Sequence, residues 1–205
     1  MIWVLLAIVV VLLLIIGVLV ARQQRSRRLK DEFGPEYGRV VAQRGNQRAA
    51  EKELSDRRQR VGKFEIRSLD PAARERYLAQ WAAAQRDFVD EPVGAVGQAH
   101  ELVQRVMHDR GYPVDEDFDQ RAADISVEHP VVVENYRAAH GISIRAHNGQ
   151  ASTEQLRQAM VHFRALFDDL LAPDDVRQAQ EEASADEFAH DNDGGAVPQQ
   201  ATPRG

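Results

Sequence analysis

Residues 152–171 read STEQLRQAMVHFRALFDDLL, and this stretch decides the fold. Ser152 and Gln155 have the capping-box spacing, in which the first side chain bonds a backbone N–H of the first helical turn and the second side chain bonds back. Large apolar residues then recur every three or four positions, which predicts a helix with one buried face. Its apolar face consists of Leu156, Met160, Phe163, Phe167 and Leu170. Such a helix needs other helices to cover that face.

Start and stop signals predict four further helices before this one. An acidic cap followed by proline opens a helix, and glycine with a later proline closes one. No segment alternates apolar and polar residues over a strand length. We therefore predict an all-α fold, with an antiparallel bundle of about five helices over residues 70–171. The signals are Asp70-Pro71, Asp90-Glu91-Pro92, Gly111 with Pro113, a short helix over 117–127, and His129-Pro130 to Asn148-Gly149.

The N-terminal segment is apolar throughout. The run from Ile2 to Ala21 contains no charge, and roughly 20 apolar residues in a helix match the thickness of a bilayer core. We expect a single transmembrane helix over 2–21. The alternative is a cleaved secretory signal, which has a basic start, a shorter apolar region and a small-residue cleavage site. Here the start carries no basic side chain and Arg22 follows Ala21 directly, so the pattern favours an uncleaved anchor.

A basic cluster follows the apolar run. Positive flanks stay on the cytoplasmic side of a membrane, which predicts an external N-terminus and a cytoplasmic helical domain. The alternative orientation places that domain on the extracytoplasmic side. The same cations are candidates for contact with lipid headgroups. They are Arg22, Arg25, Arg27, Arg28 and Lys30.

Charge is distributed unevenly along the 205 residues, whose overall net charge is −6. Residues 22–69 carry 14 basic and 7 acidic side chains, whereas residues 70–171 carry 10 and 17, and residues 172–205 carry 2 and 8. A basic segment beside the anchor is attracted to an anionic leaflet, and an acidic domain is repelled by it. An ordinary topology signal followed by a charge-rich helix explains the same gradient equally well.

The basic segment 22–69 reads as a juxtamembrane region and helical stalk. Val40, Gln47, Leu54 and Val61 recur every seven residues, but the companion positions are mostly polar. A stable coiled coil needs both seam positions apolar, so a mobile stalk is the prediction and self-association through this stripe is the alternative. The acidic end of the chain, 172–205, lacks the apolar content to offset chain entropy, and we expect it to be disordered.

The residue types argue against most familiar chemistries. There is no cysteine, which excludes thiol catalysis and cysteine-ligated metals. Asp115, Asp117 and Asp119 mimic the start of a calcium loop, but Gln120 and Ser126 stand where the loop needs glycine and glutamate. The histidines lack the close spacing of zinc ligands on a helix. We therefore expect no metal and no other cofactor. The folded part is acidic, which argues against nucleic-acid binding.

Polar residues at helical spacing form one candidate cluster. Tyr136 and His140 are neighbours on a helix surface, and Glu134 and His162 join them as possible members of a pocket. Buried polar groups of this kind often fix the register of packed helices, and catalysis is the sharper alternative. No phosphate loop, nucleophile elbow or diagnostic carboxylate pair accompanies them.

Several short stretches of the helical region together resemble a known group of sequences. They are similar to an uncharacterised bacterial family of small, N-terminally anchored helical proteins, usually labelled hypothetical or secreted, and the likeness covers residues 33–171. The resemblance implies no activity, cofactor or catalytic residue. The stretches are QW at 80–81 through FVD at 88–90, VM at 106–107 through RGYP at 110–113, QRAAD at 120–124, HP at 129–130 through NYR at 135–137, and LRQAMVH at 156–162.

Two functional hypotheses follow from the sequence. The first is a single-pass membrane-anchored interaction or scaffold module that binds a protein partner and performs no catalysis. The second is an enzyme or ligand-binding domain that uses a polar pocket near Tyr136, His140 and His162. The first has more support because an anchor, a spacer and a domain without catalytic groups are all present.

Overall fold

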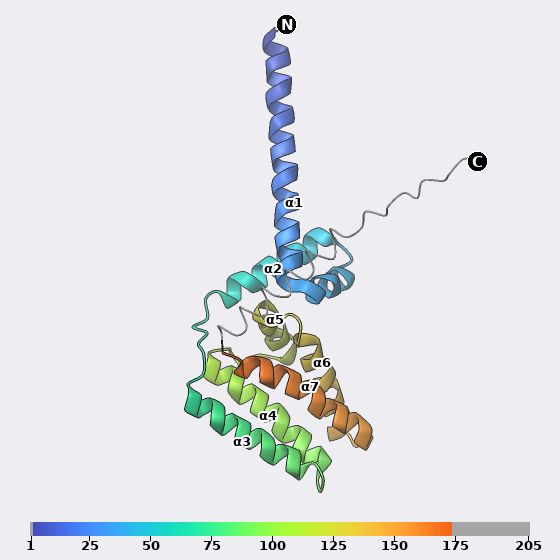
Figure 1. Ribbon diagram of the computed structural model, residues 1–205. Coiled ribbons are helices and arrows are strands. Elements are labelled where there is room, and N and C mark those ends of the chain that lie inside the picture. Colours follow the sequence, from blue (N-terminus) through green and yellow to red (C-terminus); the bar gives the residue numbers. More distant parts are fainter. Residues whose placement is uncertain (1, 174–205) are drawn as a thin grey trace, which may run out of the picture.

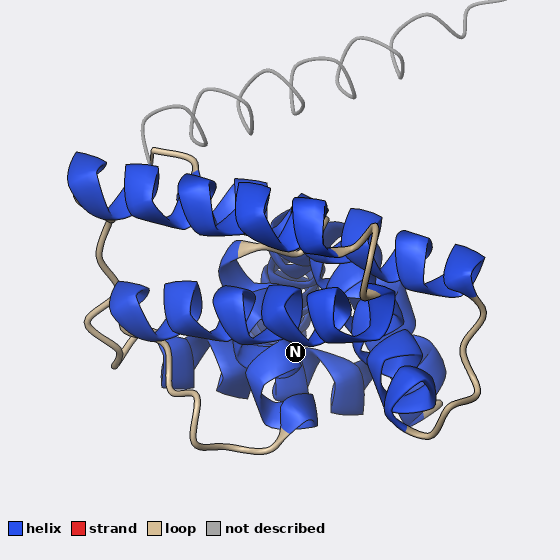
Figure 2. Ribbon diagram, turned by 90° about the horizontal axis from the view of Figure 1, so that it is seen from below, coloured by secondary structure: helices blue, strands red, loops and turns tan. Residues whose placement is uncertain are grey.

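A computed structural model describes residues 2–173, apart from the side chains of residues 2, 4–11 and 18. Every regular element within this range is a helix, and no strand occurs there (Figures 1 and 2). The disorder predicted for 172–205 falls outside the described residues from residue 174 onward. The helices are α1 (Ile2–Arg44), α2 (Gln47–Val61), α3 (Pro71–Asp87), α4 (Pro92–Arg110), α5 (Phe118–Glu128), α6 (Val133–His147) and α7 (Thr153–Leu171).

Helices α3 to α7 share one hydrophobic core (Figure 1). Helices α3 and α4 run antiparallel, since Tyr77 bonds Asp109 and Gln80, further along α3, bonds Arg105. Helices α6 and α7 are joined by the short link 148–152, and Asn135 near the start of α6 bonds His162 of α7. Helices α4 and α7 run parallel, since Arg110 donates to the Leu170 carbonyl at 2.8 Å. The arrangement is a helical bundle in which α4 and α7 are direct neighbours that run in the same direction.

The capping signals explain where most of these helices begin and end. Asp70 accepts from the Ala73 backbone at 2.7 Å, and Ser152 and Gln155 form both bonds of the capping box. Gly111 ends α4 in the left-handed conformation, with φ at 97°. Helix α6 differs, because it starts at Val133 and not at the His129-Pro130 signal. Pro130 disfavours helical backbone geometry at the residue before it, His129. Residues 130–132 form a turn, and the helix begins after them.

The basic segment folds back on itself as a helical hairpin. Helix α1 bends at Gly34, whose φ of 43° favours glycine, and Pro35 follows it. Gly45 and the cap residue Asn46 then turn the chain into α2. The two helices bury a small core of their own, made of Leu29, Phe33, Tyr37, Val40, Ala50 and Leu54.

This hairpin differs from the mobile stalk that the sequence predicted. Val40 and Leu54 do lie on an apolar stripe, but the turn at Gly45 brings them together across the hairpin. The hairpin core also receives Val127 of α5, so the segment rests against the bundle. Residues 62–70 complete the link, and the Arg67 backbone donates to the Arg110 carbonyl at 2.9 Å.

The first part of α1 projects from the folded body as a straight helix (Figure 1). Apolar side chains on several sides of it are exposed, including Leu13 at 63% and Ile16 at 54%. Within the part of the chain that the structure describes, no helix reaches the combined length and hydropathy of a membrane span. Half of the side chains in the predicted transmembrane segment 2–21 are outside that description.

Candidate functional site

The most concentrated polar structure joins the hairpin to the bundle and is centred on Glu36. This carboxylate lies just after the bend in α1, and only 2% of the residue is exposed. Arg137 of α6 grips it with two nitrogens, each 2.8 Å from a different carboxylate oxygen. Arg57 of α2 donates to it as well, at 2.8 Å. Such forked, charge-assisted bonds are strong and fix orientation.

Further polar contacts join the helices around Glu36. Arg57 also pairs with Glu53 and donates to the Ser126 hydroxyl of α5 at 3.2 Å. Arg60 pairs with the buried Asp124 of α5. Four helices, α1, α2, α5 and α6, therefore meet through ion pairs and not only through apolar packing. Breaking one member of a buried ion network leaves its partners unpaired in a low dielectric, which is costly.

The predicted headgroup residues Arg22, Arg25, Arg27, Arg28 and Lys30 are all exposed. Arg25 donates to Ser55 of α2 at 2.9 Å, and Lys30 lies 5.4 Å from the centre of the Tyr37 ring. Arg22, Arg27 and Arg28 make no ion pair with any other described residue. These cations therefore lie on the surface of α1, next to the apolar run.

The candidate polar cluster does not form a single pocket. Glu134 is exposed and extends the Glu36 network, lying 3.4 Å from Arg137 and 3.6 Å from Arg39. His162 pairs instead with Asn135, with 2.9 Å between the His162 Nδ1 and the Asn135 Oδ1. Tyr136 and His140 do lie together on the inner side of α6. The structure thus divides the four residues among three environments.

Tyr136 and His140 belong to a layer of rings inside the bundle. Phe118 stacks on His140 at 3.6 Å and tilts against Tyr136 at 4.9 Å, while Phe163 of α7 closes the layer. The Tyr136 hydroxyl and the His140 Nδ1 are buried and make no hydrogen bond of ordinary geometry within residues 2–173. Burial raises the pKa of Tyr136, an effect that Arg121 and Gln104 partly offset.

His100 is absent from the residues that the sequence indicates, yet its ring centre lies 5.5 Å from that of His140. Burial, reinforced by His140 and Arg121, lowers the pKa of His100 to about 4. Burial and Arg121 also lower the pKa of His140. Both shifts favour the uncharged imidazole, and a pKa of about 4 makes His100 a weak base.

A groove of about 330 Å³ runs between α4 and α6 beside these histidines. Val93 and Ile144, which form part of its walls, are 49% and 50% exposed. Val96 and Ala146 are buried along it. His140 lines this groove, whereas Glu134, Tyr136 and His162 do not, so only one of the four polar residues chosen from the sequence contributes to it.

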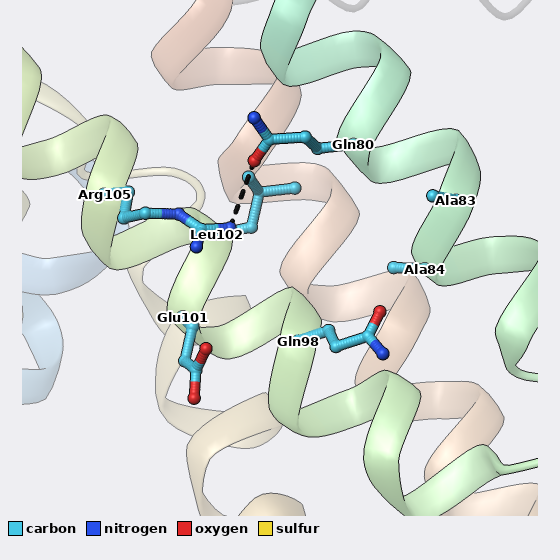
Figure 3. Close-up of a pocket in the computed structure, with 7 residues that line it drawn as sticks. All are labelled: Gln80, Ala83, Ala84, Gln98, Glu101, Leu102 and Arg105. Atoms are coloured by element: carbon cyan, nitrogen blue, oxygen red, sulfur yellow. Dashed lines mark hydrogen bonds between the residues drawn. The ribbon is translucent and has the colours of Figure 1, made fainter.

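A second, more polar hollow of about 250 Å³ lies between α3 and α4 (Figure 3). Arg105 crosses it to donate to Gln80 at 3.1 Å, and Glu101 and Gln98 extend from the same helix (Figure 3). Ala84 and Leu102 are its buried apolar residues. The internal Arg105–Gln80 bond fills part of the hollow, which makes it a surface depression and not an enclosed site.

One of the three aspartates that mimic a calcium loop has a structural role. Asp117 caps α5 by accepting from the Gln120 backbone at 2.8 Å. Among the described residues, no group of three or more histidine or carboxylate side chains is arranged to hold a metal ion.

Comparison with known proteins found no matching family model, no matching curated protein and no matching solved structure.

Proposed function

We propose that the protein is a single-pass membrane-anchored interaction module, with residues 2–21 as the anchor and the bundle as the part that meets a protein partner. The observation that carries the proposal is the exposure of the apolar side chains on the projecting part of α1. A helix apolar on all sides belongs in a nonpolar environment. The basic residues that follow it match the flank of a membrane span.

The ion pairs of Glu36 support a second part of this proposal, in which the hairpin holds the bundle in a fixed orientation relative to the anchor. The apolar segment continues as an unbroken helix to Leu29 and Phe33 in the hairpin core, and the bend at Gly34 lies between this helix and Glu36. Glu36 then connects that arm to α6 through Arg137. A partner would therefore meet the bundle at a defined distance and angle from the anchor.

The α4–α6 groove is the part of the bundle that we propose for partner binding. Its exposed apolar residues, Val93 and Ile144, lie near the ends of their helices remote from the hairpin. A protein segment with an apolar side chain suits this groove, and the histidines at its inner end add hydrogen-bonding groups. The heptad stripe is less suited to self-association, because Val40, Leu54 and Val61 are buried within the protein itself.

The alternative of a catalytic or ligand pocket near Tyr136, His140 and His162 has less support. His162 is engaged with Asn135, and the rings of Phe118 and Phe163 pack against the other two residues. The orientation that we propose is a cytoplasmic bundle with the N-terminus outside, following the basic flank.

Two measurements on cells test the proposal, aided by the absence of native cysteine. First, the full chain should stay in the membrane pellet after alkaline carbonate extraction, and Leu13→Arg with Ile16→Arg should release it. Second, Ala201→Cys should react with an impermeant maleimide only after lysis. Release of the unsubstituted chain by carbonate would refute the anchor. Labelling in intact cells would place the bundle on the extracytoplasmic side.

A further inference from the structure

Helix α2 lies close to the end of the apolar run, although 25 residues separate Ala21 from Gln47 along the chain. Gln47 at the start of α2 donates to Ser26 at 3.0 Å, and Arg25 donates to Ser55 at 2.9 Å. Five residues of helix from Ala21 to Ser26 correspond to about 7–8 Å of rise. The hairpin therefore returns α2 to the level at which α1 leaves the anchor.

Arg48 and Lys52 occupy the same stripe of α2 as Ser55, because positions four and seven apart share a helix face. Both side chains are exposed. Lys52 pairs with the exposed Asp56 at 2.9 Å, whereas Arg48 makes no ion pair with any other described residue. The residues of α2 that contact the bundle, Arg57 and Arg60, lie on a different side of the helix.

We propose that the first turns of α2, through Arg48, form an anionic-lipid contact surface together with Arg27 and Arg28 of α1. The inference rests on the proposed function, since it takes residues 2–21 as the anchor. A height of about 7–8 Å is within one Debye length of the bilayer surface at physiological ionic strength. The positive end of the α2 dipole lies at the same place and adds to the attraction.

The surface has a clear consequence for the bundle. Lipid contact at α2 adds a second point of attachment beside the anchor, so the hairpin lies against the headgroups and the acidic bundle points away. The sequence places the headgroup cations in residues 22–30 only, and Arg48 joins them through the fold.

The test uses the full chain in nanodiscs, with an environment-sensitive fluorophore on Ala49→Cys and a spin label carried on lipid headgroups. Quenching is compared between phosphatidylcholine alone and phosphatidylcholine mixed with phosphatidylserine. We expect stronger quenching in the anionic discs. Arg48→Gln should weaken the preference for anionic discs by roughly fivefold, the usual effect of one cation near such a surface.

Two controls separate the possible failures. Arg145→Gln removes an exposed charge at the far end of α6 and should leave quenching unchanged, and a fluorophore on Gln150→Cys should stay unquenched in both discs. A chain that enters discs but shows no lipid dependence at position 49 overturns the lipid surface and leaves the anchor intact. An equal effect of Arg145→Gln also overturns it. A chain that does not enter discs at all overturns the anchor and the surface together.

Discussion

Glu36 and Arg137 are separated by 101 positions in the chain, and they form a two-pronged ion pair in which both N–O distances are 2.8 Å. Glu36 belongs to the hairpin and Arg137 to the bundle. The carboxylate is almost completely buried and holds Arg57 at the same time. This side chain therefore connects the two parts of the fold, beside the Arg60–Asp124 ion pair and the packing of Val127 on the hairpin core.

Replacing Glu36 should separate the hairpin from the bundle. Glu36→Ala leaves the buried Arg57 with Glu53, and Arg137 with the exposed Glu134, as their remaining carboxylate partners. We expect a loss of about 3 kcal/mol in the free energy of unfolding. Urea denaturation followed by circular dichroism measures it. Glu134→Ala is the matched control, because Glu134 meets Arg137 at 3.4 Å but its side chain is 69% exposed. Its cost should stay below about 1 kcal/mol. Equal losses in the free energy of unfolding for the two variants would contradict the role of Glu36 in holding the hairpin on the bundle.

The bundle core should be most sensitive at Phe163. This ring is fully buried and stacks on His100 at 5.4 Å. Phe163→Ala removes the ring and leaves a cavity, with an expected cost of about 3–5 kcal/mol. Val161→Ala on the exposed side of α7, at 55% exposure, should cost less than about 0.5 kcal/mol. A change below roughly 1 kcal/mol for Phe163→Ala would show that α7 is packed differently.

Gly111 should not tolerate a side chain. Its φ is +97°, and an added Cβ would lie 2.4 Å from the Glu65 carbonyl oxygen. Gly111→Ala should therefore lower the thermal midpoint more than Gly149→Ala does. Gly149 also has a positive φ, of +68°, but no atom within 4 Å of an added Cβ. The difference between the two midpoints isolates the clash from the backbone strain of about 1–2 kcal/mol that both share. Equal midpoints would argue that the 62–70 link does not approach α4.

Acid should weaken the bundle through His100 and His140. Burial holds the pKa of His100 at about 4, below the value near 6.5 expected in the unfolded chain. The unfolded state therefore binds the proton first, so stability is full above about pH 6.5 and falls as the pH drops toward 4. His100→Phe should flatten this dependence in urea titrations between pH 7.5 and 4.5. His108→Gln, on the exposed side of α4, should retain the slope, and an unchanged slope in His100→Phe would refute the assignment.

The bundle was predictable because its signals are local. Asp70, Gly111 and the Ser152 capping box act within one helical turn, so short-range chemistry sets where α3, α4 and α7 begin or end. The all-helical fold predicted from them is confirmed within residues 2–173. Directions of consecutive helices then follow from the short links between them.

The hairpin was not predictable in the same way. Its core is small, and Val40 and Leu54 look like members of one stripe until Gly45 is recognised as a turn. Glu36, Arg57 and Arg137 resemble any surface charges in a sequence rich in them, since pairing over 101 positions leaves no local pattern. The four residues of the candidate polar cluster do not lie together, for a related reason. Helical spacing predicts that Tyr136 and His140 share a helix face, but it does not predict which helix packs against that face.

The bend at Gly34 is the first break in the helical geometry of α1. Everything before it, from Ile2 to Phe33, is one rod without a joint. A rotation of residues 2–21 about the helix axis is therefore transmitted to Leu29 and Phe33, which are buried in the hairpin core. A rotation of this helix must either move the whole hairpin with it or strain the ion pair between Glu36 and Arg137. The ion pair is therefore a contact that breaks when the helix turns relative to the bundle.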